Sequence, residues 1–160
     1  MAIIAIALAG CSQNKTTQER IGVYDSRAVA VAYVGSVAQA NKMSDLKTQM
    51  NRARATGDTR TMARLEKEGQ AWQSKLNQQG FGTAPVDDLL ADIANNLPAI
   101  QEAASVTNLI SKWNKTELDK HPHAAPDDVT MRLVDAFQPN ETQRQRAIEI
   151  QKMKPQQIKE

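Results

Sequence analysis

The chain has 160 residues, of which only 4% are aromatic, and its formal net charge at pH 7 is +2. The length suggests a single domain, and so few aromatic side chains predict a thin core, which favours an elongated or oligomeric protein. A charge of this size does not by itself indicate nucleic-acid binding. The single cysteine, Cys11, excludes an intramolecular disulfide.

The N-terminal segment, residues 1–10, is an unbroken apolar run that is followed at once by Cys11. A helix of ten residues is about 15 Å long and a hydrocarbon core is about 30 Å thick, so the run is too short to span a membrane. Small residues, Ala9 and Gly10, precede the cysteine as they do at export-signal cleavage sites, whereas the Lys or Arg that normally opens such a signal is missing. The segment resembles a bacterial lipoprotein signal peptide.

This resemblance implies cleavage before Cys11, a diacylglycerol on its sulfur and an acyl chain on its amine, and therefore a periplasmic protein that is tethered to a membrane. Because Ser12 rather than aspartate follows the cysteine, the outer membrane is the expected location. Residues 11–19 are polar and without periodicity, which is typical of a flexible tether. The alternative interpretation is a buried N-terminal strand in which the cysteine is a small packed thiol.

Residues 21–25 alternate apolar and other side chains and predict a short strand. Ser26 is the expected N-cap of a helix that begins near Arg27. The apolar pattern of the next segment predicts an antiparallel helical hairpin over about residues 36–79, because heptad-like spacings continue on both sides of a turn at Gly57. The residues of this seam are Met43, Leu46, Met50 and Ala53 before the turn and Met62, Leu65, Gly69, Trp72 and Leu76 after it.

In the expected register Ala53 lies opposite Met62 and Met43 lies opposite Trp72. A stripe of two apolar residues per heptad leaves most of each helix exposed, so the hairpin is expected to project. The pattern is as consistent with a spacer or an oligomerisation coiled coil as with a binding arm.

Charge is segregated along the chain. Between residues 42 and 75 the basic residues outnumber the acidic ones by eight to four, whereas residues 85–130 are acidic. This distribution makes a basic binding arm plausible, and the alternative is a pair of solvated helix faces. The candidate client-binding residues are Lys42, Lys47, Arg52, Arg54, Arg60, Arg64, Lys67 and Lys75.

Glycines and prolines divide the rest of the chain. Residues 80–85 break the helix, and residues 86–100 predict another that Pro98 kinks or restarts after Asn96. Residues 106–113 predict a second strand, and residues 128–137 a helix that ends before a proline. Asn140 is the expected cap of a polar helix that reaches about Lys154.

Two stretches carry a family resemblance. Residues 21–29, Ile-Gly-Val-Tyr-Asp-Ser-Arg-Ala-Val, and residues 127–137, Asp-Asp-Val-Thr-Met-Arg-Leu-Val-Asp-Ala-Phe, resemble the opening strand and the closing helix of the Skp/OmpH family of periplasmic chaperones. Residues 106–113 lie where that family returns to its sheet. The resemblance covers about residues 20–138. It implies a small β body with a further strand near residues 117–119, a homotrimer, and basic arms that enclose unfolded outer-membrane proteins without ATP.

We therefore expect an α+β, helix-dominated fold in which a small β body carries a projecting antiparallel coiled-coil hairpin. The expected division is a signal peptide over residues 1–10, a tether over 11–19, a Skp/OmpH-like domain over 20–138 with its arm at 36–79, and a polar helix and tail over 139–160. The expected function is that of an ATP-independent periplasmic holdase. The alternative is a membrane-tethered adaptor that binds one folded envelope partner through its hairpin.

The sequence offers little support for catalysis. His121 and His123, with Asp119 nearby, could be drawn as a metal site, but Pro122 fixes the backbone between them and a solvated loop is the favoured interpretation. Neither a catalytic-triad signature nor a phosphate-binding glycine loop occurs. We expect no enzyme activity, no cofactor, no metal and no nucleic-acid partner.

Overall fold

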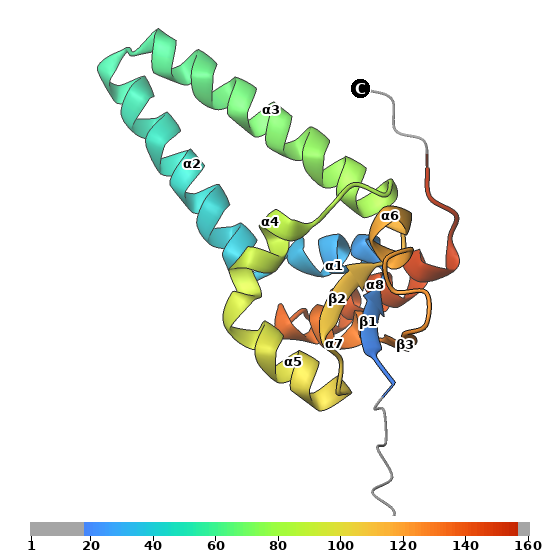
Figure 1. Cartoon of the computed structure of the whole chain (residues 1–160). Coiled ribbons are helices and arrows are strands. Elements are labelled where there is room, and N and C mark those ends of the chain that lie inside the picture. Colours follow the sequence, from blue (N-terminus) through green and yellow to red (C-terminus); the bar gives the residue numbers. More distant parts are fainter. Residues whose placement is uncertain (1–17, 157–160) are drawn as a thin grey trace, which may run out of the picture.

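The computed structural model describes residues 18–156 and shows a small body from which two long helices extend (Figure 1). The expected signal peptide, lipidation site Cys11 and most of the expected tether lie outside the described residues. Within residues 18–156, the helices are too short or too polar to cross a membrane. The elements are β1 (Arg20–Tyr24), α1 (Ser26–Tyr33), α2 (Val37–Thr56), α3 (Thr59–Phe81), α4 (Asp87–Leu90), the 3-10 helix η1 (Ala91–Asn96), α5 (Leu97–Ala104), β2 (Asn108–Ser111), α6 (Lys115–Leu118), β3 (Ala125–Asp128), α7 (Thr130–Ala136) and α8 (Glu141–Lys152).

The three strands form a parallel sheet in the order β2-β1-β3. Ile21 in β1 is aligned with Asn108 in β2, and Arg20 is aligned with Ala125 in β3. The central strand therefore comes first in the chain, and both of its neighbours come from the later half. The prediction of a helix-dominated α+β protein with a small β body is confirmed.

The edge strand β3 was not predicted, and the resemblance placed its extra strand wrongly. Residues 115–118, close to the expected strand at 117–119, form helix α6, whose first turn is capped by Asn114. The strand forms instead at residues 125–128, although Pro126 lies within it. Proline is tolerated at an edge, where its missing N–H removes no interior hydrogen bond. Backbone hydrogen bonds hold β3, because Ala125 N–H donates to Glu19 O at 2.8 Å and Val129 N–H donates to Val23 O at 3.0 Å.

The core lies where α1, α7 and α8 pack together beside the sheet. Val29, Leu133 and Ala147, one from each of these helices, are fully buried. The C-terminal helix is therefore an integral part of the body. Gly22 in β1 allows this close packing, since a Cβ there would lie 2.9 Å from Leu109 Cδ2 and 3.0 Å from Val129 Cγ2.

Helix boundaries follow local capping chemistry. Asp25, not Ser26 as predicted, is the N-cap of α1, and its carboxylate accepts from the N–H of Arg27 at 3.0 Å. A carboxylate reaches the free amides of a first turn as a serine hydroxyl does. The expected single helix over residues 86–100 is divided into α4, η1 and α5, and the restart after Asn96 with Pro98 in the first turn is confirmed. Asn140 caps α8 as predicted.

The long helices α2 and α3 are joined by a tight turn at Gly57 and diverge toward the body (Figure 1). Gly57 has φ +68°, the left-handed conformation that glycine adopts without strain. Burial along the predicted seam is uneven: Ala53 near the turn is 5% exposed, whereas Met43 is 49% exposed. The seam is thus closed near the turn and open toward the body.

Candidate functional site

All eight predicted basic residues lie on the two long helices, and all eight are exposed. Three of them have local partners. Arg64 pairs with Glu68 at 3.2 Å, Lys75 pairs with Asp88 at 2.8 Å, and the ammonium of Lys42 lies 5.2 Å from the ring centre of Trp72. The other five form no ion pair with any residue in the range 18–156; they are Lys47, Arg52, Arg54, Arg60 and Lys67.

A groove of about 750 Å³ lies between α2 and α3. Six of the predicted seam residues line it, and the divergence of the helices leaves Met43 exposed. From α2 come Met43, Leu46 and Met50, and from α3 come Leu65, Gly69 and Trp72. Gly69 has no atom within 4 Å of its would-be Cβ, so it leaves the groove wide at that level. We call this feature the arm groove.

The arm groove combines apolar walls with positive charge. Lys47 is exposed and lines the groove beside the methionines. Lys42 lies over the face of Trp72, a cation–π contact that orients the indole. The thioether side chains of Met43 and Met50 can adapt to partners of irregular shape. The groove can therefore contact apolar and acidic side chains of a bound molecule together.

The body anchors the base of α3. Lys75 Nζ lies 2.8 Å from Asp88 Oδ2, and Gln79 Nε2 donates to Asp88 Oδ1 at 2.7 Å. Burial by itself raises the pKa of Asp88, but the hydrogen bonds from Lys75 and Gln79 outweigh it and the pKa is lowered. Lys75 therefore has a partner in the body, whereas the partners of Arg64 and Lys42 lie on α3.

A second cluster, which sequence reasoning missed as an ionic site, lies at the carboxyl end of β1. Asp25 and Arg27 have side chains that are each 1% exposed, with Arg27 Nη2 donating to Asp25 Oδ2 at 2.8 Å. Lys112 Nζ lies 2.7 Å from the same oxygen, and Trp113 Nε1 donates to Asp25 Oδ1 at 3.2 Å. The indole of Trp113 also stacks on both cations, 4.9 Å from Arg27 and 4.8 Å from Lys112.

The cluster is suited to holding charge rather than to moving protons. Burial alone raises the pKa of Asp25, but the hydrogen bonds from Arg27, Lys112 and Trp113 outweigh it, so the pKa is lowered and the carboxylate stays ionised. Arg27 Nε and the backbone N–H of Arg27 also donate to this carboxylate, at 3.1 and 3.0 Å, and Arg27 Nη1 donates to Met153 O at 2.9 Å. The cluster thus fastens β1, α1, β2 and the end of α8 to one another.

The histidines are not brought together as metal ligands. His121 Nδ1 lies 2.8 Å from Glu19 Oε1, and His123 is exposed in the loop before β3. Residues 18–156 contain no group of three or more His, Cys, Asp or Glu side chains with the geometry to hold a metal ion. Trp72 lies in the arm groove, and Trp113, the last residue of the predicted second strand, lies just after β2 on the ionic cluster.

Comparison with known proteins identifies no relative: no family model, no curated protein and no solved structure matches the chain. The resemblance to the Skp/OmpH family therefore depends on the residues quoted for it.

Proposed function

We propose that this protein is an ATP-independent holdase that binds unfolded outer-membrane proteins through the arm groove, tethered to a membrane by lipid on Cys11. The observation that carries the proposal is the open apolar groove between α2 and α3, which is lined by seam residues and flanked by exposed cations. In this proposal the two helices act as a projecting antiparallel hairpin. Chemical energy is not required, because binding and release depend on the affinity of the groove for an extended chain.

Apolar contact accounts for the recognition of unfolded clients. An unfolded chain exposes the apolar side chains that folding or membrane insertion later covers, and burying one of them is worth about 1.5–3 kcal/mol. Met43 is 49% exposed and Met50 is half-buried, so both have surface that a client can cover. Leu65, 3% exposed, forms the floor of the groove.

Charge accounts for preference among clients. The five unpaired cations on α2 and α3 favour segments that carry Asp or Glu. Because these charges are exposed, their contribution is screened by salt over about 10 Å at 0.1 M ionic strength. Holdase activity is therefore expected to weaken, and not to vanish, as salt is raised.

The test is suppression of aggregation of an unfolded outer-membrane β-barrel diluted from urea, measured by light scattering at low and high salt. Met43→Asp places a charge in the groove and is expected to weaken client binding about ten-fold, the equivalent of one lost apolar side chain. Thr48→Asp makes the same change in charge at an exposed position of α2 outside the groove lining, and is expected to protect as the wild type does. No suppression by the wild type at any salt would refute the proposal.

Assembly is a further expectation of this function. One pair of helices cannot surround a client, whereas three pairs can, so the proposal includes a homotrimer. The mass of the protein in solution, measured by light scattering on the chain that begins after Cys11, tests this directly. A monomer that captures a single folded envelope protein at one-to-one stoichiometry, and does not hold unfolded barrels, would favour the adaptor function instead.

A further inference from the structure

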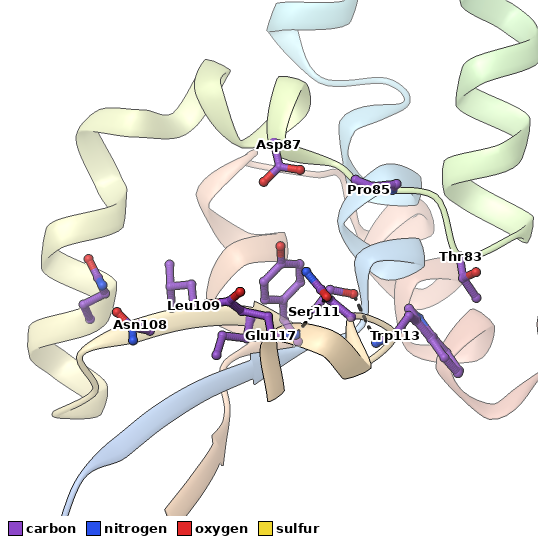
Figure 2. Close-up of a pocket in the computed structure, with 12 residues that line it drawn as sticks. Thr83, Pro85, Asp87, Asn108, Leu109, Ser111, Trp113 and Glu117 are labelled. Carbon is purple, nitrogen blue, oxygen red and sulfur yellow. Dashed lines mark hydrogen bonds between the residues drawn. The ribbon is translucent and has the colours of Figure 1, made fainter. Parts of the chain in front are cut away.

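A second cavity, of about 610 Å³, lies on the body between β2 and the segment that leads from α3 into α4. Figure 2 shows Asp87 on the α4 side of this cavity and Asn108, Leu109 and Ser111 on the β2 side, with Glu117 next to β2. We call it the sheet cavity. None of its lining residues lines the arm groove, so the two sites are separate.

Tyr24, at the end of the central strand, lines the sheet cavity. The residue is 5% exposed, and its hydroxyl forms no hydrogen bond with any residue in the range 18–156. Burial first and the Asp87 carboxylate second raise the pKa of Tyr24 to about 12, and both residues line the cavity. Because the hydroxyl has no partner among the described residues, it is available to a bound molecule.

The lining offers both donors and acceptors. The hydroxyls of Thr83 and Ser111 and the amide of Asn114 can donate, whereas two other amides use a nitrogen elsewhere. Gln101 Nε2 donates to Thr107 O at 2.8 Å, and Asn108 Nδ2 lies 3.5 Å from His121 Nε2. The side-chain oxygens of these two amides remain free.

Both carboxylates of the lining also have free oxygens. Asp87 forms no side-chain hydrogen bond or ion pair within the described part of the chain, and Glu117 pairs with Lys120 through Oε2 only, at 2.6 Å. The cavity therefore has unused acceptor oxygens on the side chains of Asp87, Gln101, Asn108 and Glu117.

The charge of the lining also favours a ligand that carries N–H donors and a positive charge. Among the described residues that line the cavity there are two carboxylates and neither Lys nor Arg. The cations close to the lining already have partners: Lys120 pairs with Glu117, and Arg27 and Lys112 are both bound to Asp25. A ligand with several N–H donors and a positive charge matches both the acceptors and the carboxylates.

We propose that the sheet cavity binds a small organic cation, an ammonium or a guanidinium, through its N–H groups. Asp87 is the charge partner, Tyr24 Oη and the oxygens of Gln101 and Asn108 accept further hydrogen bonds, and Glu117 receives a second cationic end when the ligand has one. The same chemistry is offered by a free amine and by the basic side chain of a polypeptide. This site does not depend on the holdase function, because it shares no residue with the arm groove.

The test is titration of the full chain with agmatine, which has one guanidinium and one ammonium, followed by calorimetry. We expect saturable binding at one site per chain, and none for 1,4-butanediol, which has a similar length and no charge. In a Trp72→Phe variant Trp113 is the remaining tryptophan, and its fluorescence is expected to change with the same midpoint, which locates the site beside the sheet.

Matched variants make the assignment specific. Asp87→Asn is expected to weaken agmatine binding about ten-fold or more, the effect of losing a charge-assisted hydrogen bond, and Tyr24→Phe about five-fold. Asp92→Asn removes the same charge from a neighbouring exposed position that does not line the cavity, and is expected to leave binding unchanged.

A blocked Gly-Arg-Gly peptide distinguishes the sources of the cation. Binding of the peptide identifies a polypeptide side chain as the ligand, and binding of agmatine alone identifies a free amine. The proposal is overturned if agmatine does not saturate, if the diol binds equally well, or if Asp87→Asn and Asp92→Asn behave alike. Loss of holdase activity with intact agmatine binding would refute the proposed function and not this one.

Discussion

The buried pair of Asp25 and Arg27 provides the sharpest test of how this body is held together. The change is Asp25→Asn, which keeps the size of the side chain and one oxygen for the helix cap but removes the charge. Removing one partner of a buried ion pair costs about 3–5 kcal/mol, because the other charge stays buried without compensation. Lys112 is 34% exposed and can turn to water, whereas the Arg27 side chain is 1% exposed and loses its counter-charge but keeps Met153 O and the ring of Trp113. We therefore expect the lower end of the range, about 3 kcal/mol.

Urea unfolding followed by far-UV circular dichroism measures this loss. With a slope of about 2 kcal/mol per molar urea, the midpoint is expected to fall by about 1.5 M. Asp127→Asn is the control, since its pair with Arg20 spans 3.3 Å between side chains that are 38% and 47% exposed. Such a pair is worth at most about 1 kcal/mol, so the control midpoint is expected to fall by less than about 0.5 M.

The pH dependence of the stability difference between the wild type and Asp25→Asn gives a second measurement. The pKa of Asp25 is lowered in the folded protein from its ordinary value of 3.8, so the unfolded chain binds the proton more readily. The stability that the carboxylate contributes is therefore fully present well above pH 3.8 and is lost as the pH falls below that value. The difference between wild type and Asp25→Asn should be constant at neutral pH and shrink in acid. A midpoint that moves less than the control's, or a difference that grows in acid, would refute the reasoning.

Three further changes test single elements by urea unfolding. Gly57→Ala meets no atom within 4 Å but must adopt φ +68°, so it is expected to cost about 1 kcal/mol, and no loss would show that the turn rearranges. Asn140→Ala removes the acceptor for Gln143 N–H at 2.9 Å and is expected to cost about 1 kcal/mol, with Thr142→Ala as the exposed control. Leu133→Ala, at a position with 0% exposure, is expected to cost about 3 kcal/mol, and a cost under about 1 kcal/mol would mean that the core collapses around it.

Elements with local signals were predictable from the sequence. Strand β1, the start of α5 after Asn96 and the Asn140 cap of α8 each depend on side chains that act within a few residues, and each is found in the structure. Strand β3 has no such local signal in the sequence. Its sequence, Ala-Pro-Asp-Asp, has no strand propensity, and it forms because β1 offers backbone partners from a segment more than 100 residues earlier.

The candidate sites were predictable to different extents. Heptad spacing identified the residues of the arm groove, because periodicity places them on one face of each helix. The heptad pattern could not show that the two helices diverge. The distance between their ends at the body depends on α1 and α4, which hold α3 through contacts such as that of Lys75 with Asp88. The partnership of Asp25 with Lys112 was hidden for the same reason, because the two residues meet only when β1 and β2 pair.

The route of the chain through the body also fixes when folding can finish. The central strand β1 is synthesised first. Its neighbours β2 and β3 and the covering helix α8 come from residues 108–152, and the guanidinium of Arg27 donates to the carbonyl of Met153. Every contact of this kind closes a loop of about a hundred residues, which is entropically costly and slow. A growing chain can form α2 and α3 early, but Val29 and its neighbours on α1 stay uncovered until synthesis has passed Met153. Packing of this body therefore has to wait until the segment that ends at Met153 has been made.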